Sequence, residues 1–134
     1  MAFNDMFRLS SHGVFTNQEG KVLLLKATYG EKGWGLPGGS LEPGETIHEA
    51  LLRECSEELG VTINILYMSG MYLHQHYHSH TCIFRCEITS LQSIQLSTEH
   101  SEYRYFMLDE LTPVQHHRIF DCIHFDGNIM SAKF

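Results

Sequence analysis

Basic residues are few in this sequence. It has 9 Lys and Arg against 16 Asp and Glu, and therefore a formal net charge of −7 with neutral histidines. Proteins that bind nucleic-acid polymers or anionic membrane surfaces depend on clustered cations. The composition therefore argues against both kinds of partner, including the end of a long RNA. If the ligand is a phosphate ester, an acidic chain needs a bound cation to approach it.

Long apolar runs and paired cysteines are also missing. The longest aliphatic stretch covers only residues 22–25, far short of the ~20 apolar residues of a membrane helix. No cationic region followed by an apolar one opens the chain, as it would in a secretory signal. The cysteines show no Cys-x-x-Cys spacing; they are Cys55, Cys82, Cys86 and Cys122. We therefore expect a cytoplasmic protein with reduced thiols and no membrane partner.

The order of the predicted elements indicates an α/β or α+β sandwich with a mixed sheet. No repeat or linker divides the 134 residues, so residues 1–134 are expected to form one domain. Strands at 7–16 and 21–26 are predicted to pair as a hairpin, and residues 30–44 to form a shaped, glycine-rich loop. Further strands are predicted near 61–65, 71–77, 81–88 and 103–107, and a second helix after Thr112.

The clearest local signal is a helix that starts after Thr46. Thr46 and Glu49 form a capping-box pattern, and Gly60 supplies a left-handed stop. Glu57 and Glu58 fall in the last turn, where the helix dipole disfavours negative charge. This conflict with stability points to a function for the two carboxylates.

Helical projection places three carboxylates, those of Glu54, Glu57 and Glu58, within an arc of about 100°. The residues expected to face the core are Leu51, Leu52, Cys55 and Leu59. A solvated acidic face is one explanation. The other is a site for a hard cation, because Mg²⁺ and Mn²⁺ prefer carboxylate and carbonyl oxygens. The sequence Pro37-Gly38-Gly39 before the helix favours this second explanation, since bare backbone can approach an ion or a phosphate closely.

Residues 39–61 read GSLEPGETIHEALLRECSEELGV. This segment resembles the Nudix box, G-x5-E-x7-R-E-U-x-E-E-x-G-U, in which U is a bulky aliphatic residue. All fixed positions match: Gly39, Glu45, Arg53, Glu54, Glu57, Glu58 and Gly60. The one departure is Cys55 at the first U position, where a thiol can pack as a small hydrophobe. The resemblance implies a small MutT-like Nudix domain with an α/β/α sandwich fold.

The resemblance also implies a reaction and a set of roles. Nudix enzymes hydrolyse a nucleoside diphosphate linked to another group. The implied ligands of Mg²⁺ or Mn²⁺ are Glu54, Glu57, Glu58 and the carbonyl of Gly38, with Gly38 and Gly39 beside the substrate. Arg53 would orient the carboxylates and Glu45 would be its partner, although Glu45 could equally form only a salt bridge at the start of the helix. The alternative to an enzyme is a Nudix-fold module that senses a nucleotide without cleaving it.

Further candidates lie outside the box. Glu102 is our choice for a catalytic base or further ligand, because residues 102–106 resemble an E-x-x-W stretch of the family, and Glu99 competes with it. Lys26 matches an often cationic, substrate-binding position, or is a solvated strand end. Trp34 could stack on a base but is better explained by packing beneath the loop. The sequence does not indicate which nucleotide derivative is cleaved, nor the oligomeric state.

Histidines are abundant, and four recur at every second position: His74, His76, His78 and His80. On one strand they would share a face and could bind Zn²⁺, Ni²⁺ or Cu²⁺. Ser79 and the polar residues around it predict a turn that would separate the rings. One of these histidines contacting substrate, or an exposed hairpin surface, are the other two explanations.

Overall fold

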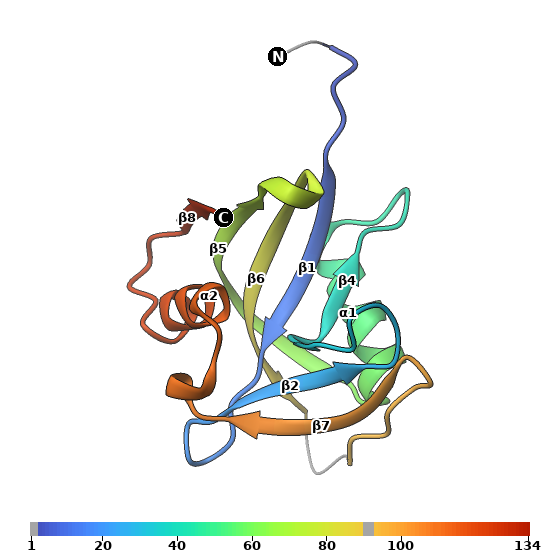
Figure 1. The fold of residues 1–134 in the computed structure, drawn as a ribbon, viewed down its shortest axis with the longest axis vertical. Coiled ribbons are helices and arrows are strands. Elements are labelled where there is room, and N and C mark those ends of the chain that lie inside the picture. The colour runs from blue at the N-terminus through green and yellow to red at the C-terminus, as the bar shows by residue number, and fades with distance from the viewer. Residues whose placement is uncertain (1–2, 90–92) are drawn as a thin grey trace.

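A five-stranded mixed sheet lies between two helices in the computed structural model, which describes residues 3–89 and 93–134. Its strand order is β4-β1-β6-β5-β8, with β1–β6 and β5–β8 parallel and the other pairs antiparallel. A smaller antiparallel sheet, β3-β2-β7, lies at one end of the larger one (Figure 1). The expected α+β sandwich with a mixed sheet is confirmed.

The strands are β1 Arg8–Val14, β2 Val22–Ala27, β3 Trp34–Gly35, β4 Gly38–Ser40, β5 Ile63–His74, β6 Ser79–Ile88, β7 His100–Phe106 and β8 Met130–Lys133. The helices are α1 Ile47–Leu59 and α2 Pro113–Ile123, with short 3₁₀ turns at Gln75–Tyr77 and Leu108–Glu110. In the described part of the chain, neither helix has the length and apolar character needed to cross a bilayer.

Both helix predictions are confirmed by their caps. Thr46 and Glu49 form the full capping box of α1, and Gly60 ends the helix with a φ of 65°. Thr112 caps α2 by accepting a hydrogen bond from the backbone N–H of Gln115. No basic residue lies in the last turn of α1, so nothing on that turn offsets the charges of Glu57 and Glu58.

The predicted hairpin of the first two strands is wrong. The turn forms, since Asn17 caps it through hydrogen bonds to the N–H groups of Glu19 and Lys21. Beyond the single bridge between Thr16 and Val22, however, β1 pairs with β4 and β6 whereas β2 pairs with β3 and β7. The chain therefore crosses from one sheet to the other at this turn, because partners distant in sequence outcompete the neighbouring strand.

Three smaller predictions also need correction. The glycine-rich segment 30–44 is not wholly irregular, because it contains β3 and β4. The strands expected near 61–65 and 71–77 are one long strand, β5, which carries two register shifts against β6. The C-terminal strand β8, which extends the sheet beyond β5, was not predicted.

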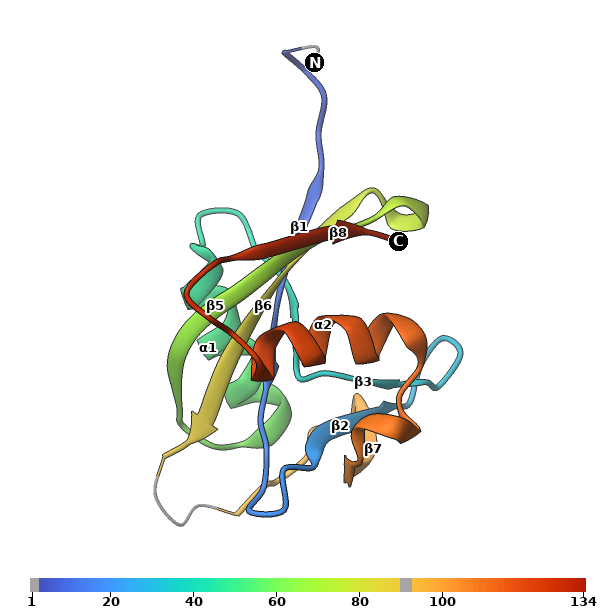
Figure 2. The same ribbon diagram turned by 90° about the vertical axis from the view of Figure 1, so that its left-hand side faces the viewer.

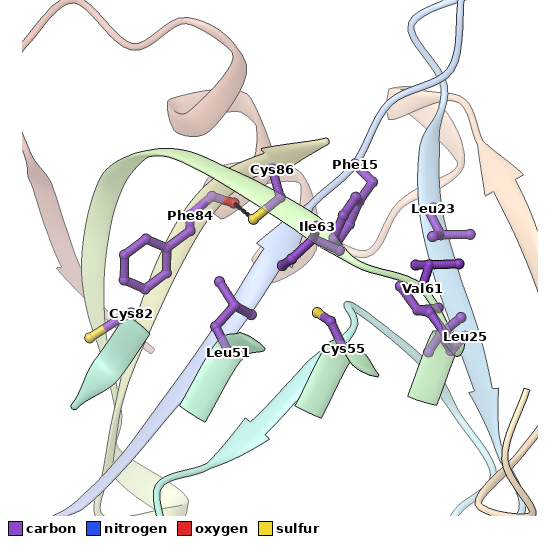
Figure 3. Close-up of a cluster of buried hydrophobic side chains, with 11 residues drawn as sticks. Phe15, Leu23, Leu25, Leu51, Cys55, Val61, Ile63, Cys82, Phe84 and Cys86 are labelled. Atoms are coloured by element: carbon purple, nitrogen blue, oxygen red, sulfur yellow. Dashed lines mark hydrogen bonds between the residues drawn. The ribbon is translucent and has the colours of Figure 1, made fainter. Parts of the chain in front are cut away.

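Two hydrophobic clusters lie on opposite faces of the large sheet. Helix α1 packs on one face, where Leu51 and Cys55 point towards Phe84 and Cys86 of β6 (Figure 3). Helix α2 packs on the other face, against Tyr72 and Ile83 (Figure 2). Leu52 lies outside both clusters and is 45% exposed, so its expected place in the core is wrong. All four cysteines are buried and free.

Strand β2 contributes to both clusters. Leu23 and Leu25 face the α1 side, and Val22 and Leu24 face the α2 side. This explains the four consecutive aliphatic residues, since successive side chains of a strand point to opposite faces. The same alternation in β1 and β6 places polar residues, among them Ser10, His12 and Thr81, on the α2 side of the large sheet.

Candidate active site

Glu58 is a buried carboxylate at the C-terminal end of α1. The residue is only 4% exposed, and its Oε1 accepts a 2.7 Å hydrogen bond from the backbone N–H of Gly38. Burial raises the pKa of Glu58 to about 8, and the neighbouring carboxylates Glu54, Glu99 and Glu57 add to the rise. Among the described residues, the one basic side chain within salt-bridge distance of Glu58 is His100, at 3.8 Å. Burial lowers the pKa of His100, which leaves its ring neutral at pH 7.

Arg53 contacts acidic side chains both on α1 and just before it. Its Nε and Nη2 donate to the two carboxylate oxygens of Glu45, at 2.7 and 3.0 Å, and Nη2 also donates to the carbonyl of Ser40. Its Nη1 lies 2.9 Å from Glu54 Oε1 and 3.4 Å from Glu57 Oε2. The hydrogen bond from Arg53 lowers the pKa of Glu45. Glu45 is thus the bidentate partner of Arg53, in the arrangement that the resemblance implied.

The two glycines of β4 bring the backbone against these acids. Gly38 has a φ of 136°, and a Cβ there would run into the carbonyl oxygen of Ser11 on β1. A Cβ on Gly39 would lie 2.6 Å from the carboxylate carbon of Glu54. Gly38 cannot accommodate a side chain next to β1, whereas a side chain at Gly39 would push the carboxylate of Glu54 away from the strand.

A cavity of about 510 Å³ opens beside this arrangement. Gly38, Gly39, Glu54 and Glu58 line one wall of it, so the structure brings together four of the predicted site residues. The side chain of Glu57 lies outside, 61% exposed. Burial raises the pKa of Glu54 although Arg53 opposes the rise. The cavity therefore presents an acidic wall in which Glu54 is paired with Arg53, whereas Glu58 has no charged partner among the described residues.

The geometry favours Glu99 over Glu102. Glu99 lines the cavity, and its charge raises the pKa of both Glu54 and Glu58. The segment that carries it is fastened to the end of β2, since the N–H of Thr28 donates to the Glu99 carbonyl at 2.9 Å. Glu102 does not line this cavity; it pairs across β7 and β2 with Lys26, at 3.9 Å and largely in solvent. Lys26 and Glu102 are therefore not brought to the acidic wall.

Several cavity residues were not singled out from the sequence. Tyr29, His12 and Arg118 line both the larger cavity and a smaller one of about 220 Å³ beside it. No local pattern distinguishes these three residues, because they meet only once distant strands and α2 have been assembled.

Trp34 was singled out from the sequence. It lines the smaller cavity and packs edge-to-face on Phe106, with ring centroids 5.1 Å apart.

The four alternating histidines do not form a cluster. His74 ends β5, His76 lies in the 3₁₀ turn, His78 has a left-handed backbone and His80 lies on β6. The turn separates their rings as expected, and only His74 lines the larger cavity. Among residues 3–89 and 93–134, no group of three His, Cys, Asp or Glu side chains is already arranged to hold a metal ion.

Comparisons with known proteins agree with this picture. A family model described as NUDIX domain matches residues 6–122. The RNA pyrophosphohydrolase of Actinobacillus succinogenes is 36% identical over 72 residues, which are 52% of this chain and 36% of that protein. The 8-oxo-dGDP phosphatase NUDT18 of Homo sapiens is 48% identical over 50 residues, 36% of this chain and 16% of that protein. The matches thus span about a third or less of these curated relatives.

Solved structures match over nearly the whole chain. An ADP-ribose pyrophosphatase of Streptococcus suis superposes with a TM-score of 0.76 at 16% identity, covering 96% of this chain and all of that one. The MutT protein of Methanosarcina mazei superposes with a TM-score of 0.71 at 25% identity, covering 93% and 96%. With Gly39, Glu54 and Glu58 of the box lining the cavity and a family match over most of its length, this chain belongs to the Nudix family.

Proposed function

We propose that the protein is a Nudix hydrolase that cleaves the phosphoanhydride bond of a nucleoside diphosphate derivative with Mg²⁺ or Mn²⁺ as cofactor. The observation that carries this proposal is the acidic wall: Glu54 and Glu58 share one cavity with Gly38 and Gly39, and no described cation neutralises Glu58. The curated relatives named for pyrophosphohydrolase and phosphatase activities support the reaction class.

The donor set fits a hard divalent cation. Glu54, Glu57 and Glu58 offer carboxylate oxygens and Gly38 offers a carbonyl, which are ligands that Mg²⁺ and Mn²⁺ prefer. Burial, and to a smaller extent the repulsion of neighbouring carboxylates, raises the pKa of Glu54 and Glu58, and a bound cation would oppose both effects. Because no ready-made group of three ligands exists in the described residues, an ion would have to draw the carboxylates closer together. When bound, the ion would neutralise the diphosphate and lower the pKa of water.

The residues of this chain would divide the remaining work. Arg53, held by Glu45, would keep Glu54 in position, because its guanidinium contacts both carboxylates within 3.0 Å. Gly38 and Gly39 would admit the phosphates close to the backbone. Glu99 at the cavity rim would take the proton of the attacking water, with Glu102 as the competing choice.

The substrate class needs a direct screen. The net charge of −7 favours small nucleotides over a nucleic-acid polymer. We would test nucleoside triphosphates, oxidised ones, nucleotide sugars, ADP-ribose, dinucleoside polyphosphates and a 5′-triphosphorylated RNA, measuring phosphate and pyrophosphate release separately. Turnover of the RNA alone would contradict the preference for small substrates.

Glutamine substitutions test the acidic wall itself. Glu57→Gln and Glu58→Gln are expected to lower turnover at least ~10²-fold, the usual cost of a lost metal ligand or charge-stabilising group. Glu87→Gln is a matched control, because Glu87 is an exposed residue of β6 and accepts a hydrogen bond from the Asn64 side chain. Near wild-type turnover in both test variants would refute the proposal. Nucleotide-induced stabilisation without any product would indicate the non-catalytic sensor instead.

A further inference from the structure

Arg118 is a buried cation without an acidic partner. It extends from α2 to the polar side of the large sheet and is 9% exposed. Its Nη2 donates to Gln115 Oε1 at 2.8 Å and its Nη1 donates to His74 Nε2 at 3.1 Å. Both partners are uncharged groups, and Arg118 Nε has no hydrogen-bond partner among the described residues. No carboxylate in the described part of the chain forms a salt bridge with it.

Such a group is costly for the fold. Burial of an unpaired guanidinium is strongly unfavourable, and a well-packed apolar side chain at the same place is often more stable. Burial lowers the pKa of Arg118 to about 10, which still leaves it protonated at pH 7. A charge retained against stability, and facing a cavity, is a sign of function.

Arg118 carries the positive charge on its side of the cavity, because the histidines next to it are neutral. His12 and His74 lie beside it; burial lowers the pKa of His12 to about 3 and also lowers that of His74. Both rings are therefore neutral at pH 7. His12 Nδ1 is likewise buried without a partner, so a second polar atom of the same cluster is unsatisfied. Since a guanidinium only donates, His74 Nε2 must accept, and the proton of that ring is on Nδ1.

Arg118 stands where the two cavities meet. The larger and the smaller cavity share five lining residues: His12, Tyr29, Gly38, Glu58 and Arg118. Carboxylates therefore form one wall of a polar space, and a guanidinium with two neutral imidazoles forms another. Two of the five N–H groups of Arg118 are used within the protein and the Nε–H is buried, which leaves one N–H on each of Nη1 and Nη2 for a ligand.

We propose that Arg118 is a specificity-determining residue, which binds an anionic group of the substrate, a phosphate or a carboxylate, that is separate from the diphosphate at the acidic wall. An anion would neutralise the buried charge and accept the free N–H groups in a bidentate manner. A neutral acceptor, such as the edge of a base, would leave the charge uncompensated. This inference rests on the proposed function for the identity of the ligand as a substrate, but the binding site itself can be tested without turnover.

The first test uses inorganic pyrophosphate as the probe, with EDTA present so that no metal contributes. The wild-type protein is expected to bind pyrophosphate saturably in calorimetric titration at constant ionic strength, and Arg118→Met at least about tenfold more weakly. Arg8→Met is the matched control, because Arg8 lines the larger cavity from the start of β1 and is exposed. Arg118→Met is expected to fold, since it removes an unpaired buried charge.

Three results would overturn the proposal: no pyrophosphate binding by the wild-type protein, equal binding by Arg118→Met, or loss of binding in Arg8→Met alone. Should Arg118→Met fail to fold, Arg118→Lys serves instead. It keeps the charge but not the planar fork, and is expected to bind pyrophosphate more weakly than the wild type.

The second test compares substrates that differ by one anionic group. ADP-ribose is paired with its 2′-phosphate, and UDP-glucose with UDP-glucuronate, so that the two arms separate a phosphate from a carboxylate. The wild type is expected to prefer the charged member of at least one pair. Arg118→Met is expected to lose that preference about tenfold or more, through KM rather than kcat. A preference that persists in the variant would refute the inference. Pyrophosphate binding that depends on Arg118, without hydrolysis of any substrate, would refute the proposed function alone.

Discussion

The backbone N–H of Gly38 donates a 2.7 Å hydrogen bond to the carboxylate of Glu58, a residue 20 positions further along the chain. This bond ties strand β4 to the last turn of α1. It also places a carboxylate where the helix dipole and burial both oppose it. Four predictions follow the consequences of that arrangement and of the residues around it.

Replacing Gly38 by alanine is expected to destabilise the protein by about 3 kcal/mol or more and to abolish turnover. The new Cβ would clash with the carbonyl of Ser11, and the φ of 136° is unfavourable for any side chain. Gly44→Ala is the control, because Gly44 also has a positive φ but a Cβ there meets nothing within 4 Å. Urea denaturation should show a clearly smaller loss, about 1 kcal/mol, for the control. Equal losses would mean that the close approach is unimportant.

Replacing Glu99 by glutamine is expected to lower kcat by about 10²-fold and to change the acidic limb of the pH–rate profile, as loss of a general base does. Glu102→Gln is expected to stay within about threefold of the wild type, because Glu102 lies away from the cavity and pairs with Lys26. The reverse pattern would restore Glu102 as the base.

Divalent cations are expected to stabilise the folded protein. Mg²⁺ or Mn²⁺ at 100 times its dissociation constant should add about 2.7 kcal/mol to the free energy of unfolding. The rise in Tm should be reduced in Glu58→Gln and retained in Glu87→Gln. An unchanged Tm of the wild type in millimolar Mn²⁺ would count against the ion site.

Stability without metal is expected to depend on pH through Glu58. Its pKa is about 8 in the folded protein and ordinarily 4.5, so between these values the folded state binds more protons than the unfolded chain. The free energy of unfolding therefore falls as pH rises through this window, by up to about 1.4 kcal/mol per pH unit. Chemical denaturation in EDTA should show this fall in the wild type relative to Glu58→Gln. The opposite contribution of His12 cancels in that comparison. Parallel curves for the two proteins would disprove a raised pKa.

Local signals accounted for the parts of the fold that depend on neighbouring residues. The cap of α1 by Thr46 and Glu49 involves contacts three residues apart, and it was predicted correctly. Strand pairing is not local: the turn at Asn17 formed, yet β1 and β2 joined different sheets. Leu52 was misplaced because angular position on the helix does not reveal where the sheet ends.

The candidate site divides in the same way. The acids of the box, with Gly38 and Gly39, could be read from one continuous segment; Glu54 and Glu58 line the cavity with the two glycines, whereas Glu57 lies outside it. Glu99 was only the competitor of Glu102 in the sequence analysis, and Arg118 was not singled out at all. Glu99 reaches the cavity because its segment is bonded to Thr28. Arg118 reaches it because α2 lies across β5 and β6, and a polar residue in an amphipathic helix carries no mark of the cavity it will face.

The placement of β2 between the two clusters has a mechanical consequence. Val22 and Leu24 pack in the cluster under α2, and Leu23 and Leu25 pack in the cluster under α1, so this six-residue strand links the two clusters. Loss of packing under α2, which carries Arg118, is therefore expected to weaken the packing under α1, which carries the acids. We therefore expect both clusters to unfold in one cooperative transition.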